Sequence, residues 1–173
     1  MMLKLTKYEG FTLIECLVVI SIIAILTAMA VPSFRQLKDH GQQLQVVYQL
    51  QAAVLMARHL SIIEHRTVLI CPARAGMKIE TSQSPACDDN YAEGVALWSE
   101  HSVGWRLRRV WQWSSITLTN RRGNRKVSET VVFNTQGLAN RNLTWSTCVA
   151  KRNLSLVLNR VGRPAIRRQW GVC

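Results

Sequence analysis

Acidic residues are scarce in this sequence, and none occurs after Glu129. The 173 residues include 10 Asp plus Glu against 22 Lys plus Arg, which gives a formal net charge of +12. No run is dominated by Pro, Gly or Ser, and 48% of the residues are hydrophobic, which argues against collagen-like and disordered chains. The length suits one domain with a proper core, and the excess of cations makes polyanions the first partners to consider.

The motifs of common catalytic and metal sites are also missing. The sequence has no Gly-x-Ser-x-Gly, no Gly-rich phosphate loop and no His-Glu-x-x-His. Asp88 and Asp89 stand together, but in a segment with two prolines that is typical of a surface loop. There is no Cys-x-x-Cys pair, and the four histidines are scattered. We therefore expect no catalytic residues, no metal site and no cofactor.

One long hydrophobic run lies near the amino terminus. After a short polar start that contains Lys4 and Lys7, residues 11–31 carry a single charge, Glu15. As a helix this run is about 30 Å long, which matches the hydrocarbon core of a bilayer. A signal peptide usually has a shorter apolar region without a carboxylate, and in a plain membrane anchor Glu15 would cost about 2.5 kcal/mol or more.

A third interpretation accounts for Glu15. The segment Gly10-Phe11-Thr12-Leu13-Ile14-Glu15 resembles the processing site of type IV prepilins, in which a basic leader ends in Gly and the mature chain carries Glu at its fifth position. The resemblance implies that a prepilin peptidase cuts after Gly10 and methylates Phe11, and that the helix moves from the inner membrane into a filament core. There, the amino group of a neighbouring subunit could neutralise Glu15. It also implies a cytoplasmic leader, a globular part outside the cytoplasm and a helix bend at Pro32.

Hydrophobic periodicity divides the rest of the chain. We expect a leader over residues 1–10, a membrane and filament-core helix over 11–32, an amphipathic continuation over 33–64, and a globular β domain with a basic tail over 65–173. The fold class is therefore α+β, with a long helix packed on a mostly antiparallel sheet. The predicted sheet-covering stripe of the helix comprises Leu37, Leu44, Val47, Gln51, Val54, Leu55, Arg58 and Ile62. Strands are predicted over 66–71, 95–99, 105–113, 116–119, 130–133, 143–149 and 154–159.

The cysteines fit an exported domain. Cys16 lies in the apolar helix, where we interpret it as a small apolar side chain. The remaining four cysteines are an even number, as disulfide pairing in an exported domain requires. Four cysteines allow three pairings. We favour Cys71 with Cys87, across the proline-containing loop, and Cys148 with Cys173, which would tie down the end of the chain; each could contribute about 3 kcal/mol in the chain-entropy account.

Cations gather in the second half of the sequence. Arg121, Arg122, Arg125 and Lys126 surround Gly123-Asn124, a typical hairpin tip. A second group extends from Lys151 to the end of the chain, with Trp170 in it. Arginine suits bidentate phosphate contacts, and indole faces stack on bases or guanidinium planes. Acidic lipid and acidic polysaccharide would be attracted by the same field, so charge alone does not choose among them.

Beyond the leader, the sequence resembles the FimT/GspH group of minor pilins and pseudopilins. The resemblance rests on the segments at 57–58, 66–71, 94–98 and 133–137 and on a carboxy-terminal Gly-Arg. FimT-like members bind DNA during natural transformation through a Gly-Arg-x-Arg signature. Here Gly162-Arg163 is present, and Pro164-Ala165-Ile166 separates it from Arg167 and Arg168.

The resemblance implies a minor pilin that binds DNA without sequence readout and assembles with other major and minor pilins. In an extended segment Arg163 and Arg167 would project to one side about 13 Å apart, a spacing that can reach two phosphates. The alternative is a structural minor pilin or GspH-like pseudopilin that primes or caps a filament, and a membrane-surface adhesin is a third hypothesis. The expected DNA contacts are Arg160, Gly162, Arg163, Arg167, Arg168, Lys151 and Arg152, together with Arg121, Arg122, Arg125 and Lys126 of the hairpin.

Overall fold

The computed structural model describes residues 10, 12–78, 81–113 and 116–173. The predicted leader residues 1–9 and the predicted methylation site Phe11 lie outside the described residues. The chain divides into two compact units, Met1–Lys38 and Asp39–Cys173, and a single helix, α1 (Leu13–Ile63), contributes to both.

In the first unit, α1 starts at a polar cap and continues through Pro32. The Thr12 hydroxyl accepts from the Glu15 backbone N–H, and the Glu15 carboxylate accepts from the Thr12 backbone N–H, both at 3.4 Å. This reciprocal pair is a capping box, so Glu15 also helps to start the helix. The described apolar side chains of this unit are exposed, and the helix is long and apolar enough to cross a membrane.

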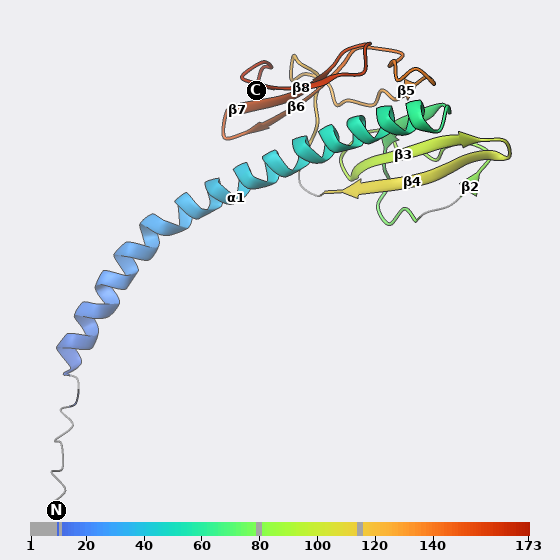
Figure 1. The fold of residues 1–173 in the computed structure, drawn as a ribbon. Helices are drawn as coiled ribbons and strands as arrows, with labels where there is room; N and C mark the ends of the chain where they lie inside the picture. Colours follow the sequence, from blue (N-terminus) through green and yellow to red (C-terminus); the bar gives the residue numbers. More distant parts are fainter. Residues whose placement is uncertain (1–9, 11, 79–80, 114–115) are drawn as a thin grey trace, which may run out of the picture. The chain divides into compact units, whose positions relative to one another are not determined.

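The second unit packs two antiparallel sheets on the carboxy-terminal half of α1 (Figure 1). The five-stranded sheet has the order β2-β4-β3-β1-β5 and the three-stranded sheet the order β6-β7-β8. The strands are β1 (Val68–Pro72), β2 (Thr81–Ser82), β3 (Gly94–His101), β4 (Gly104–Gln112), β5 (Val131–Phe133), β6 (Leu143–Val149), β7 (Arg152–Leu158) and β8 (Pro164–Arg168). The predicted α+β architecture is confirmed.

The main core lies where the helix meets both sheets. Val47, Leu50 and Val54 of α1 are fully buried in one cluster with side chains from β1, β3, β5, β6 and β7. From β7 that cluster takes Leu154, Leu156 and Leu158, which strand alternation puts on one face. Every buried core side chain among the described residues lies in the second unit, so this unit contains a complete core of its own.

A smaller core covers the opposite face of the five-stranded sheet. It contains Leu69, Trp98 and Leu107, with Cys87 packed against them from the following loop. A disulfide joins Cys71 to Cys87, as predicted, with the two Cα atoms 5.7 Å apart. The bond therefore fastens the proline-containing loop over this second core.

Two sequence predictions were wrong in detail. The predicted sheet-covering stripe includes Leu37, Leu55 and Ile62, but all three are exposed; the buried stripe is Gln43, Val46, Val47, Leu50, Ala53, Val54, Ala57 and Ser61. Apolar residues occur on both sides of this helix, so periodicity did not identify the buried side. The predicted strand over 116–119 is reduced to isolated bridges from Thr119 to Lys126 and to Ser146.

Candidate nucleic-acid interface

The predicted basic hairpin tip is present. Thr119 bridges Lys126, and the Asn120 backbone N–H donates to the Arg125 carbonyl oxygen at 2.8 Å. Gly123 has a φ of 71°, a left-handed conformation that favours glycine, and a Cβ there would come within 2.7 Å of the Val172 carbonyl oxygen. The four cations of the tip are all exposed: Arg121, Arg122, Arg125 and Lys126.

Glu129 limits the positive charge of this tip. Its carboxylate pairs with Arg125. Partial burial raises the pKa of Glu129, but hydrogen bonds from the backbone N–H groups of Glu129 and Ser128 and from Arg125 outweigh it, so the pKa lies below its usual value. The other ion pair among the described residues joins Arg108 to Glu64, so no described cation after Glu129 is in an ion pair.

The predicted carboxy-terminal site contains an additional strand. The tail forms β8, an edge strand paired with β7, and a turn closed by Asn159 precedes it. The Asn159 side chain accepts from the Arg163 backbone N–H at 2.9 Å. Gly162 is buried with a φ of 76°, and a Cβ there would collide with the Gly137 carbonyl oxygen. Gly162 therefore shapes the turn and is not itself accessible to a ligand.

Strand register separates the tail arginines between two faces. Arg167 is opposite Ser155, and Arg168 is opposite Leu154 of the core, so the two side chains leave on opposite faces of the sheet. Arg163 directly precedes the strand and has the same parity as Arg167, so an extended chain at about 3.3 Å per residue would separate their Cα atoms by about 13 Å. Both residues are exposed.

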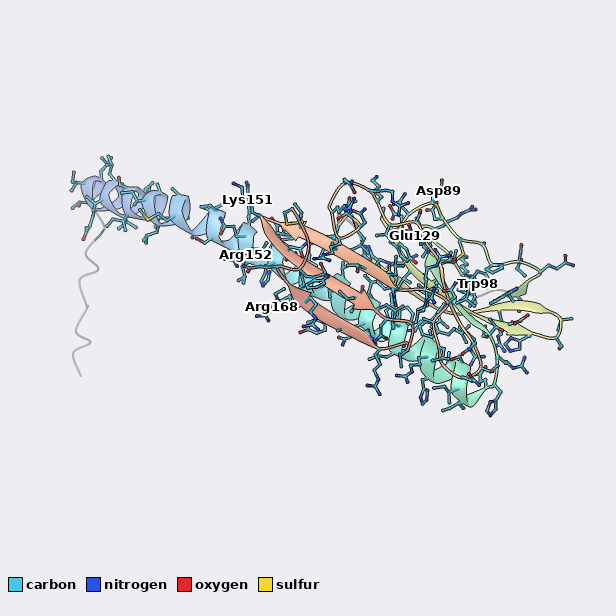
Figure 2. All side chains as sticks on the ribbon, turned by 90° about the horizontal axis from the view of Figure 1, so that it is seen from above. Asp89, Trp98, Glu129, Lys151, Arg152 and Arg168 are labelled. Carbon is cyan, nitrogen blue, oxygen red and sulfur yellow. A yellow bond between two sulfur atoms is a disulfide. The ribbon has the colours of Figure 1, made fainter. Side chains whose placement is uncertain are left out.

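Lys151 and Arg152 lie at the turn between β6 and β7. Ala150 and Lys151 have φ values of 46° and 65°, as in a tight two-residue hairpin turn. Figure 2 shows Lys151, Arg152 and Arg168 at the same end of the three-stranded sheet. Arg160 is in the turn before β8, at the opposite end of β7. The seven predicted carboxy-terminal contacts therefore form no single cluster.

The structure does bring the hairpin tip and the tail together, which the sequence did not predict. Cys148 and Cys173 form a disulfide, as predicted, with the Cα atoms 5.5 Å apart. The Val172 backbone N–H donates to the Arg121 carbonyl oxygen at 3.0 Å. The guanidinium carbon of Arg121 lies 4.2 Å from the ring centroid of Trp170. Residues far apart in the sequence thus share one surface.

A second surface that the sequence did not predict runs along α1. Its exposed positions between Gly41 and Ile62 recur in alternating steps of four and three and carry no Lys, Arg, Asp or Glu: Gly41, Gln45, Tyr48, Ala52, Leu55, His59 and Ile62. We call this set the α1 outer stripe. The 4-3 spacing is that of a seam which packs against another helix.

Comparison with known proteins agrees with this architecture. Residues 5–31 match the prokaryotic N-terminal methylation motif, and residues 47–162 match the family described as type II transport protein GspH. No curated protein sequence matches the chain. Two crystal forms of the type IV minor pilin FimU of Pseudomonas aeruginosa share its fold.

Both FimU structures are 14% identical to this chain. One has a TM-score of 0.52 and an alignment over 73% of this chain and 97% of FimU. The other has a TM-score of 0.54 and covers 78% and 98%. This likeness establishes the fold, and the two sequence matches establish the family. The chain belongs to the GspH family and is a type IV minor pilin or pseudopilin, with an amino-terminal helix long and apolar enough to cross a membrane.

Proposed function

We propose that this minor pilin captures DNA outside the cell, without sequence readout, for uptake in natural transformation. Its leader is cut after Gly10 by a prepilin peptidase, its helix anchors it in the inner membrane before assembly, and its globular unit is then exposed on a pilus with other pilins. The residues expected to contact DNA are those of the basic tail, assisted by the hairpin tip.

The proposal rests on one observation: the arginine-rich tail is fixed in place, and its arginines form no ion pairs with acidic side chains among the described residues. Arg163 and Arg167 are exposed, and neither is in an ion pair among the described residues. The disulfide from Cys148 to Cys173 fixes the chain beyond them, which lowers the ordering cost of binding. Guanidinium groups on a fixed strand suit phosphate oxygens, which are the same for every DNA sequence.

The test uses the fragment Asp39–Cys173, which contains the complete core. A labelled duplex of mixed sequence is titrated with oxidised fragment at several salt concentrations. We expect the logarithm of affinity to fall with the logarithm of salt at a slope of about −0.9 per phosphate contact. Changing Arg163, Arg167 and Arg168 together to Gln should weaken binding about tenfold and make the slope shallower.

A matched control removes the same charge elsewhere. Arg74, Lys78 and Arg106 are exposed and lie outside the three-stranded sheet. Changing these three to Gln should alter affinity less than about threefold, because only long-range attraction is lost. Equal losses in the two variants, or no binding by the unaltered fragment, would refute a DNA site in the tail.

A structural subunit that primes or caps a filament is the second candidate, and the α1 outer stripe favours it. Leu55 is 48% exposed in the middle of an uncharged helix face. Leu55→Arg should leave the fragment folded and monomeric, yet reduce incorporation of the full chain into pili, while His59→Arg nearer the end of the helix is the milder control. If DNA binding is absent and Leu55→Arg blocks assembly, the structural function replaces the DNA-binding one.

A further inference from the structure

Trp170 is the most exposed of the six tryptophans. Trp98 and Trp145 are fully buried, Trp111 and Trp113 are almost so, and Trp105 is half-buried, whereas Trp170 remains 44% exposed. Its indole also lies outside both core clusters. Packing within the described chain therefore does not account for this large aromatic side chain.

The position of Trp170 is nevertheless fixed from several sides. The Arg121 Nε donates to the Trp170 carbonyl oxygen at 3.3 Å, and its guanidinium lies over the indole ring. Both neighbours of Trp170 in the sequence are bonded to Asn153. The Gln169 backbone N–H donates to the Asn153 carbonyl oxygen at 3.0 Å, and the Gly171 backbone N–H donates to the Asn153 side-chain oxygen at 2.8 Å. The nearby disulfide holds the last residue. The aromatic ring is thus preorganised on the surface.

Besides Arg121, exposed cations are present on the strand that leads to Trp170 and on the hairpin tip. The Ser155 hydroxyl donates to the Asn153 side chain that holds the tail, and Ser155 is opposite Arg167 in the register. Arg167 therefore leaves the sheet on the face that the tail crosses. Arg122 and Lys126 are exposed beside Arg121 on the hairpin tip. An exposed indole among cations is the combination used to bind single-stranded nucleic acid.

We infer that the Arg121–Trp170 pair is a stacking site for an unpaired nucleobase. This inference rests on the proposed DNA-binding function and specifies its substrate. The guanidinium covers one side of the indole, and a base would stack on the exposed remainder while Arg167 and the hairpin cations hold the adjoining phosphates. In a duplex the base faces are already stacked on one another, so the chain should prefer single strands and unpaired ends.

Three probes of equal length separate base stacking from charge. They are a mixed-sequence single strand, a blunt duplex, and a single strand in which abasic sugars replace the central bases. At one fixed salt concentration, the fragment Asp39–Cys173 should bind the intact strand about tenfold more tightly than the abasic strand. Trp170→Leu should remove that difference and leave duplex binding nearly unchanged, and Trp170→Phe should restore part of it.

Arg168→Gln is the matched control, because Arg168 leaves the sheet on the opposite face. It should weaken binding to the intact and abasic strands equally. Two results would overturn the stacking site while leaving the proposed function intact. One is that the unaltered fragment binds intact and abasic strands equally well. The other is that Trp170→Leu changes the affinity for all three probes equally. Failure to bind any of the three probes would refute both.

Discussion

The side chain of Gln43 donates a hydrogen bond to the carbonyl oxygen of Arg152, 109 residues later, at 3.0 Å. The same amide donates to the Thr147 carbonyl oxygen at 3.1 Å. Gln43 is buried on α1, while the two acceptors are on the strands that lead into and out of the β6–β7 turn. One helix amide therefore holds the hairpin that presents Lys151 and Arg152.

Gln43→Leu should destabilise the second unit by about 2 kcal/mol, because it removes both hydrogen bonds that the buried amide donates to these carbonyl oxygens. Urea unfolding of Asp39–Cys173 measures the change in the free energy of unfolding. The control is Gln45→Leu, an exposed position on the same helix, which should change stability by less than about 0.5 kcal/mol. Equal midpoints for the two variants would contradict a structural role for the Gln43 amide.

Two glycine substitutions should have effects of opposite sign. Gly162 has a left-handed φ of 76° and no space for a Cβ, so Gly162→Ala should cost about 2 kcal/mol or more and loosen the turn before Arg163. Gly41 lies within α1, and a Cβ added there would meet nothing within 4 Å, so Gly41→Ala should stabilise by about 0.5–1 kcal/mol. Thermal unfolding of both variants tests this pair, and a lower melting temperature for Gly41→Ala would contradict it.

The parts of the fold that the sequence predicted are those with local signals. The strand over 143–149 was predicted with its observed bounds, because it alternates β-formers between turn residues. β8, which begins at Pro164, was not predicted from the sequence. Ile166 is the one residue of this edge strand that packs against the core. Pairing with β7, which no local pattern encodes, makes this segment a strand.

The candidate site was predictable in composition but not in arrangement. Charge and spacing identified the hairpin tip and the tail as basic. The contact between Arg121 and Trp170 depends on residues 49 apart, on the Cys148–Cys173 bond and on the Asn153 side chain, so no sequence window contains it. The pairing register of β7 and β8 also determines that the Arg167 and Arg168 side chains leave the sheet on different faces.

Glu129 gives the hairpin tip a pH-dependent contribution to stability. Its pKa is lower in the folded chain than in the unfolded chain, so its contribution is fully present above the unfolded value of about 4.5 and is lost as the pH falls through the folded pKa. Glu129→Gln should therefore cost about 0.5 kcal/mol at pH 7, an amount typical of a surface ion pair. The cost should shrink towards zero as the pH falls through the folded pKa, because the Glu129 side chain then becomes neutral, as the Gln side chain is at every pH.

Urea unfolding of the unaltered fragment and of the Glu129→Gln variant, at pH 7 and in a series of acidic buffers, measures that difference. Glu93→Gln, an acidic residue outside both described ion pairs, is the control and should show no such trend. A cost of Glu129→Gln that persists unchanged throughout the acidic series would contradict the assigned ion pair with Arg125.

The two disulfides should separate stability from DNA binding. Their cysteines are 16 and 25 residues apart, so replacing either pair with Ser should cost about 3 kcal/mol in the chain-entropy account. Of the two disulfides, only Cys148–Cys173 restrains the segment with Trp170. Its loss increases the conformational freedom that this segment must give up on binding. DNA affinity, measured well below both melting temperatures, should therefore fall severalfold in the Cys148→Ser/Cys173→Ser variant and stay unchanged in the Cys71→Ser/Cys87→Ser variant. The same affinity in both variants would show that the fixed tail does not contribute to binding.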